Sequence, residues 1–191
     1  IEETDGYLLD KTKFFWNADY GNLTFTSDHG LYKNCEGYNN GDSAVYPGSA
    51  SNVNDDDGYG QKKRWSVEIR NCKSHHNAAG YSGTAGNSVY VHDNDFYGNS
   101  VGIVMDSFFP DHPGLPQDGS TYVGNRIHSN NSDYYRYYRD GTCEKPFAER
   151  GYDNGVVCPS VPVPVGTGVL VAGGNANTFD GNWIWDNWRY G

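Results

Sequence analysis

The side chains that could carry out acid–base chemistry in this sequence gather in three successive stretches of the chain. They are basic, imidazole and acidic residues that follow short apolar runs at similar positions: Arg70, Lys73, His75, His76, His92, Asp93, Asp95, Arg126 and His128. Histidine and lysine transfer protons, and a cation stabilises an anion that forms during a reaction. If the stretches stack on one another, several of these side chains meet. The alternative is that they are ordinary polar residues on the outside of a sheet, because every repeat must present some.

An acidic stretch is a second candidate site. It holds three consecutive aspartates, Asp55, Asp56 and Asp57. Calcium binds several oxygen ligands at short spacing, so these carboxylates are candidate calcium ligands. The stretch does not follow the EF-hand pattern, because Gly58 at the sixth position puts Val53 at the first and Arg64 at the twelfth. A solvated acidic loop is the alternative to a calcium site.

Two tryptophans near the end of the sequence form a third candidate. Trp183 and Trp185 flank Ile184, and if Ile184 points inward from a strand, both indoles point outward. An exposed pair of tryptophans indicates a contact. The partner is a glycan whose sugar rings stack on the indoles, a capping segment, or another subunit.

The elements that position these residues are expected to be short strands. A chain of 191 residues suits one domain, and 25 Gly with 16 Tyr indicate frequent turns. No stretch keeps the apolar spacing of a helix for three turns. We therefore expect an all-β fold with little helix.

A repeat orders these strands. Five segments share a β-rich run, an Asn, four or five residues and a second Asn. The first is Asn34, Asn71, Asn94, Asn125 or Asn182, and the second is Asn40, Asn77, Asn99, Asn130 or Asn187. Residues Tyr7 to Asn22 form an earlier, degenerate repeat. Asn tolerates the left-handed conformation of a tight bend, and stacked amides about 4.8 Å apart can form a ladder. The sequence therefore predicts about six coils.

The coils are expected to share a core and to enclose two kinds of cysteine pair. Apolar residues of successive coils should stack inward: Ile69, Val91, Phe96, Ile103, Ile127, Val169, Val171 and Ile184. Cys35 and Cys72 hold the same position in consecutive repeats and should be core neighbours, free or bonded. Cys143 and Cys158 flank a loop that a disulfide can close, with a stabilisation of roughly 3 kcal/mol.

These repeats resemble the right-handed parallel β-helix family of pectate lyases, alginate epimerases and many secreted bacterial proteins, over most of residues 22–191. The resemblance implies an all-β, right-handed parallel β-helix, and we expect one such domain over residues 1–191, as a piece of a longer chain. The repeat spacing is uneven, so the excess residues should leave as loops at Pro47 to Lys63, Ser107 to Ser120 and Tyr138 to Thr167. In a solenoid, such insertions tend to gather on one side and build the binding face.

The resemblance also implies roles for the candidate residues. In lyases and epimerases of this family, a basic residue abstracts the proton next to a uronate carboxylate, and a cation neutralises that carboxylate. The catalytic candidates are then Lys73, His75, Arg126 and His128, and the candidates for substrate binding are Arg70, His92, Asp93, Trp183 and Trp185. The order Pro-Asp-His-Pro at residues 110–113 differs from the Asp-Pro-His of mannuronan epimerases, and indicates a rigid extended loop.

The negative net charge of the chain disfavours some classes of binding partner. A net charge of −10 disfavours nucleic acid and anionic membranes, and no apolar run is long enough to span a bilayer. With a loop disulfide, these features predict a secreted or cell-surface protein that binds or cleaves a polysaccharide or other glycan. The alternative is a non-catalytic structural or adhesive module that assembles with other protein chains through exposed aromatic and end surfaces.

Overall fold

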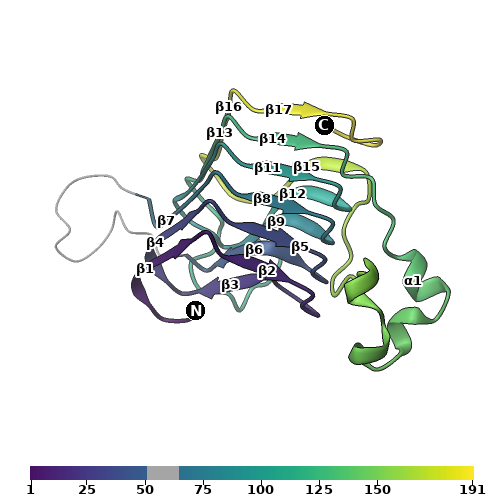
Figure 1. The fold of residues 1–191 in the computed structure, drawn as a ribbon. Coiled ribbons are helices and arrows are strands. Elements are labelled where there is room, and N and C mark those ends of the chain that lie inside the picture. The colour runs from purple at the N-terminus through teal and green to yellow at the C-terminus, as the bar shows by residue number, and fades with distance from the viewer. Residues whose placement is uncertain (51–64) are drawn as a thin grey trace, which may run out of the picture.

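The computed structural model describes residues 1–50 and 65–191, and this part of the chain forms three parallel sheets that surround one core (Figure 1). Sheet I contains β1 (Asp5–Asp10), β4 (Asp28–Lys33), β7 (Val67–Arg70), β10 (Val89–His92), β13 (Thr121–Val123) and β16 (Thr178–Asp180). Sheet II contains β2 (Lys13–Phe15), β5 (Glu36–Tyr38), β8 (Lys73–His75), β11 (Asp95–Tyr97), β14 (Arg126–His128) and β17 (Trp183–Trp185). Sheet III contains β3 (Asn22–Phe25), β6 (Ser43–Gly48), β9 (Ala79–Thr84), β12 (Val101–Asp106) and β15 (Thr167–Ala172).

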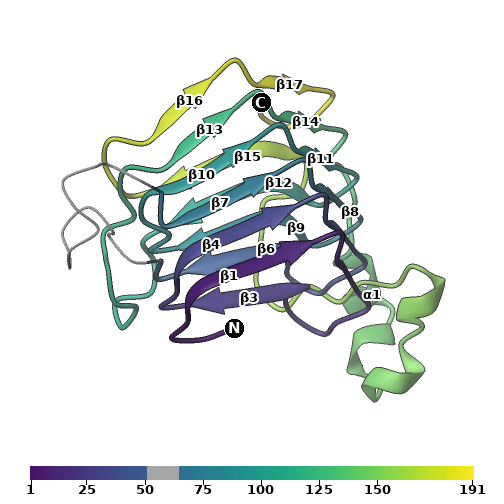
Figure 2. The same cartoon turned by 60° about the vertical axis from the view of Figure 1, so that its left-hand side comes forward.

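The chain visits the three sheets in turn, so each of the first five rungs takes one strand from each sheet, and the sixth contributes β16 and β17. Figure 2 shows the strands of sheet I side by side, from β1 at one end to β16 at the other. Successive rungs pair in parallel, as when β7 aligns Ile69 with Val91 of β10. The predicted six coils and the predicted β-helix are therefore confirmed. The described helices are short: α1 (Arg136–Arg139), η1 (Thr142–Glu144), η2 (Phe147–Glu149) and η3 (Tyr152–Asn154).

The core is built from inward side chains at equivalent positions of the rungs. The predicted core residues Ile69, Val91, Phe96, Ile103 and Ile127 are all buried. Val171 and Ile184 align with the buried Met105 and Ile127, but 45% of Val171 and 39% of Ile184 is exposed. These two belong to β15 and β17, the last strands of their sheets, so no further rung covers them in this structure.

The second predicted asparagine column forms a continuous ladder between sheets II and III. The backbone N–H of each member donates to the side-chain oxygen of the next, through Asn17, Asn40, Asn77, Asn99, Asn130 and Asn187. The residue before each member is in the left-handed region, for example Asn39 (φ 53°) and His76 (φ 57°). The tight bend and the buried ladder are thus two adjacent positions of one turn.

The first asparagine column needs a correction of one residue in two rungs. Asn34 and Asn71 are the left-handed residues of their turns (φ 57° and 52°) and align with Asp93 (φ 55°). The ladder itself runs through the next position, where Cys72 N–H donates to Asn94 Oδ1 at 2.9 Å. Asn suits both positions, so the sequence pattern did not distinguish the bend from the ladder.

The predicted insertions fall where the rungs lengthen. Residues 107–120 lie between β12 and β13, and residues 129–166 lie between β14 and β15. The loop of residues 129–166 contains α1 and carries the predicted disulfide between Cys143 and Cys158. Most of the first predicted insertion lies outside the described residues, although Pro47 and Gly48 belong to β6. Within the described residues, no helix has the length and apolar character needed to cross a membrane.

Candidate functional site

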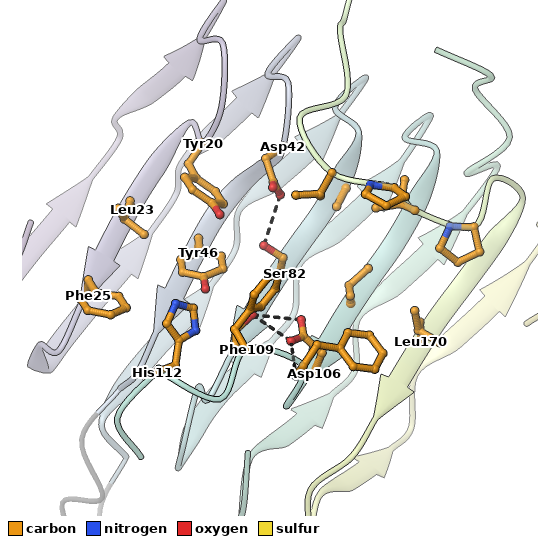
Figure 3. Close-up of a pocket in the computed structure, with 18 residues that line it drawn as sticks. Tyr20, Leu23, Phe25, Asp42, Tyr46, Ser82, Asp106, Phe109, His112 and Leu170 are labelled. Carbon is orange, nitrogen blue, oxygen red and sulfur yellow. Dashed lines mark hydrogen bonds between the residues drawn. The ribbon is translucent and has the colours of Figure 1, made fainter. Parts of the chain in front are cut away.

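A groove of about 610 Å³ lies on the outer face of sheet III (Figure 3). The loop of residues 107–112 forms one wall, through Phe108, Phe109 and His112, and the segment of residues 161–164 forms the other. Two of the predicted insertions therefore do meet on one face of the solenoid.

The floor of the groove consists of outward side chains of sheet III. Val45 and Tyr81 belong to the core, so their neighbours Tyr46 and Ser82 point outward. One row of the floor crosses five strands: Leu23, Tyr46, Ser82, Val104 and Leu170. A side chain at Gly48 would overlap the ring of Tyr46, so glycine at this position leaves room for the ring on the floor.

The second wall is held in place by a set of hydrogen bonds. We call residues 159–165 the strap. Tyr135 Oη donates to Val161 O at 2.8 Å and accepts from Val163 N–H at 2.6 Å, and Tyr138 Oη donates to Pro159 O at 2.8 Å. Ser160 N–H donates to Gly41 O at 2.9 Å. The insertion that leaves the fifth rung is thus fixed against the second rung.

Asp42 lies in the groove beside the strap and is 3% exposed. Its carboxylate accepts hydrogen bonds from Ser82 Oγ at 3.4 Å and Ser160 Oγ at 3.5 Å. Burial raises the pKa of Asp42 to about 6, although hydrogen bonds from the Ser43 backbone and the two hydroxyls act in the opposite direction. A carboxyl with this pKa holds a proton over a wider pH range than an exposed aspartate and can donate it.

Asp106 is the second carboxylate of the groove and is 5% exposed. Thr84 Oγ1 donates to both of its oxygens, at 2.9 and 3.0 Å, and Phe108 N–H donates to Oδ1 at 3.1 Å. Ser82 and Thr84, which bind the two carboxylates, are two residues apart on β9, a step of roughly 7 Å. β9 therefore supplies a different hydroxyl to each carboxylate: Ser82 donates to Asp42, and Thr84 donates to Asp106.

Aromatic side chains complete the groove near these carboxylates. The rings of Tyr20 and Tyr46 lie 4.5 Å apart between centroids. Burial raises the pKa of both hydroxyls, that of Tyr46 to about 12, so both remain protonated donors. The His112 ring packs on Phe25, and its buried Nδ1 has no hydrogen-bond partner among the described residues. None of the described residues that line the groove is Lys or Arg.

The four residues predicted to be catalytic lie on a different face, the outside of sheet II. One column of that face is a continuous stack of rings, Phe15, Tyr38, His75, Tyr97, His128 and Trp185, with centroids 4.1–5.5 Å apart. The adjacent column alternates in charge: Lys13, Glu36, Lys73, Asp95 and Arg126.

Three of the four residues predicted to be catalytic contact carboxylates of sheet II. Arg126 pairs with Asp95 at 2.6 Å, and His128 Nε2 lies 3.2 Å from the same carboxylate. His75 Nε2 lies 3.4 Å from Glu36, and burial lowers the pKa of this imidazole. Because the stacked rings cover one another's faces, they present edges to solvent, which suits cohesion between rungs better than the stacking of sugars.

The residues predicted to bind substrate divide between sheets I and II. Arg70 and His92 both contact Glu68 on sheet I, at 3.1 and 3.0 Å, and Asp93 lies at the turn that follows, 2.8 Å from His92. Trp183 and Trp185 point outward from β17, as predicted from the inward Ile184, and are 71% and 43% exposed.

The predicted calcium ligands, Asp55, Asp56 and Asp57, lie outside the described residues. Within residues 1–50 and 65–191, one group of three side chains has ligand atoms within 4.8 Å of one another: Asp5, Asp28 and His29. The His29 ring contacts Asp5 directly, so the closeness of the group is explained by that contact.

Sequence reasoning missed Asp42 and Asp106. Asp106 is the last residue of an apolar strand, and Asp42 follows the second asparagine of its rung. The positions of the insertions predicted a binding face on one side of the solenoid. They did not identify Asp42 and Asp106, which lie in the groove between the insertions.

Comparisons with known proteins identify the fold and no activity. Residues 1–191 match the family model described as "Right handed beta helix region". No curated protein and no solved structure matches the chain.

Proposed function

The chain belongs to the right-handed β-helix family, and from the groove on sheet III we propose that it binds a neutral polysaccharide and hydrolyses a glycosidic bond in it. The observation that carries the proposal is the pair of buried carboxylates, Asp42 and Asp106, in a groove lined by aromatic side chains. Secretion is part of the same proposal, because the Cys143–Cys158 disulfide is typical of oxidising compartments.

The lining suits the two kinds of surface that a sugar presents. The rings of Tyr46 and Phe109 offer apolar area to the C–H groups of a sugar, and the Tyr20 and Tyr46 hydroxyls can donate to its oxygens.

The two carboxylates have the properties required for acid–base hydrolysis. Asp42, with its raised pKa, is the proton donor to the glycosidic oxygen. Asp106, held by Thr84 and the Phe108 N–H, is the base that takes a proton from the attacking water.

The charge of the groove favours a neutral substrate. A lyase or epimerase needs a cation or a basic side chain against the uronate carboxylate, whereas the described lining holds two acids and neither Lys nor Arg. A uronate would place a third carboxylate beside Asp42 and Asp106, which is unfavourable at low local dielectric.

The test is a comparison of two sets of variants on a panel of neutral and acidic polysaccharides. Asp42→Asn and Asp106→Asn keep the side-chain shapes, and we expect them to lose release of reducing ends while retaining affinity in gel-retardation assays. Lys73→Ala and Arg126→Ala on sheet II serve as controls and should keep full activity. Proton NMR of the first product reports the anomeric configuration.

The same panel tests the sheet II site implied by the family resemblance. If Lys73, His75, Arg126 and His128 act on a uronate, acidic polysaccharides yield unsaturated products that absorb in the ultraviolet, and the controls lose activity while the aspartate variants keep it. That result would replace the sheet III proposal. No binding or cleavage of any member of the panel would refute both.

The exposed tryptophans favour a second candidate function, assembly with other protein chains. Trp183 and the partly exposed Ile184 lie together at the last rung. Light scattering should then show an oligomer whose dissociation constant rises in Trp185→Ala, and a monomer at all concentrations would contradict this candidate.

A further inference from the structure

Cys35 and Cys72 hold equivalent positions in the second and third rungs. The register pairs Lys33 with Arg70 on one side of them and Glu36 with Lys73 on the other. The two cysteines are therefore direct neighbours across the rungs, at the inter-strand spacing of about 4.8 Å. This spacing lies within the Cα separation of roughly 4.4–6.8 Å that a disulfide spans.

Both cysteines are buried inside the solenoid, and in this structure both are thiols. Cys35 N–H donates to Cys72 Sγ at 3.2 Å, and the residues are 3% and 5% exposed. In the following rungs this column is an asparagine ladder, in which Asn94 N–H donates to Asn125 Oδ1 at 3.1 Å. A thiol is a weaker acceptor than an amide oxygen, so the hydrogen bond between Cys35 and Cys72 is weaker than those between the asparagines of the ladder. Two cysteines at consecutive ladder positions can instead form a covalent bond.

We infer that Cys35 and Cys72 form a second disulfide, which links the second and third rungs when the protein folds in an oxidising compartment. The oxidant is a disulfide, of a thiol–disulfide oxidoreductase or of oxidised glutathione. One cysteine thiolate attacks it, forms a mixed disulfide and releases the first thiol. The second cysteine thiolate then attacks the mixed disulfide, forms the Cys35–Cys72 bond and releases the second thiol, so that two protons and two electrons leave the pair.

In the closed solenoid, the hydrogen bond with Cys72 lowers the pKa of Cys35 to about 7 and raises the pKa of Cys72. Both sulfurs are buried in the closed solenoid, so the oxidant reaches them before the third rung docks on the second. Once formed, the bond closes the chain segment from 35 to 72, which includes the first insertion.

Counting thiols in the full chain tests the inference. The protein is refolded in a glutathione redox buffer, denatured without reductant, alkylated with iodoacetamide and mapped by mass spectrometry. We expect no alkylated cysteine and a linked peptide that contains Cys35 and Cys72, whereas Cys72→Ser should leave Cys35 alkylated. Alkylation of both cysteines in the unmutated protein, or their pairing with Cys143 or Cys158, would overturn the inference.

A stability measurement gives an independent readout. In a Cys143→Ala, Cys158→Ala background, Cys35 and Cys72 are the only cysteines left in the sequence. Reductant should then lower the urea midpoint of this variant, and it should leave the midpoint unchanged when Cys35→Ser is added. If reductant left the midpoint of the Cys143→Ala, Cys158→Ala variant unchanged, no bond would have formed between Cys35 and Cys72.

Discussion

Replacing Asn77 by Ala should show how much of the stability of the solenoid depends on its inner asparagine ladder. Asn77 is fully buried. Its Oδ1 accepts from Asn40 N–H at 3.0 Å and from Asn40 Nδ2 at 2.8 Å. Its Nδ2 donates to Gly37 O at 3.1 Å and to Asn99 Oδ1 at 3.1 Å. Alanine removes all four of these contacts and supplies no replacement.

The magnitude follows from the groups that lose their partners. The Asn40 N–H stays buried and loses its acceptor. Because an unsatisfied buried group costs about 1–3 kcal/mol, we expect Asn77→Ala to lower the free energy of unfolding by about 2–3 kcal/mol. Asn187→Ala is the matched control, because it removes the same ladder contact to Asn130 N–H at the last rung, where the side chain is partly exposed. Water can replace that contact, so the control should cost about 1 kcal/mol or less.

Urea unfolding followed by far-ultraviolet circular dichroism measures both losses, provided that the denaturant slope is the same in each variant. Hydrogen exchange at the Asn40 amide adds a local readout, since this N–H loses its acceptor only in Asn77→Ala. Equal losses in the two variants would refute the reasoning. So would a loss below about 1 kcal/mol for Asn77→Ala.

Three further changes test other parts of the structure. The Asp42 carboxyl has a pKa of about 6 in the folded protein against 3.8 in an unperturbed aspartate, so folding binds a proton between these pH values and wild-type stability falls as the pH rises through them. Relative to wild type, Asp42→Asn should therefore gain roughly 2 kcal/mol between pH 4 and pH 7 in urea titrations, and a constant difference would contradict the raised pKa. Tyr97→Ala removes ring contacts to His75 and His128 on sheet II; it should cost about 1–3 kcal/mol while glycan affinity is unchanged, and a loss of affinity alone would assign that face to binding. Breaking the Cys143–Cys158 disulfide by double replacement with alanine should release the strap, seen as new proteolytic cleavage within residues 141–166 and a glycan dissociation constant raised at least tenfold; an intact loop with unchanged affinity would show that the tyrosine hydrogen bonds suffice.

The sequence was informative about the fold because the physics of stacking constrains each rung in the same way. The ladder formed by Asn40, Asn77 and Asn99 needs the same amide at each bend, so the pattern was visible without an alignment. The other column was misaligned by one residue at Asn34 and Asn71, because a left-handed bend and an inner ladder both favour asparagine.

The candidate site was not predictable in the same way, because it depends on contacts between distant parts of the chain. Asp42 and Ser160 are 118 residues apart in sequence and meet only because the strap returns from the fifth rung to the second. The positions of the insertions could be predicted from the irregular spacing. Their direction over the solenoid could not, because it depends on side-chain contacts such as that of Tyr135 with Val163.

The uniform direction of the ladder has a consequence for how this protein can change in length. Asn77 and Asn99 are 22 residues apart and occupy identical places in consecutive turns. Removing residues 78–99 would join two equivalent points of the backbone, and Asn77 would meet Asn130 by the same kind of bond that it now makes to Asn99. Duplication could therefore add one full turn, and deletion could remove one, while neighbouring turns keep the same asparagine hydrogen bonds. The deleted turn contains Ser82 and Thr84, which bind the two carboxylates of the groove. The solenoid can therefore lose a turn and keep its fold, but the groove would lose these two partners.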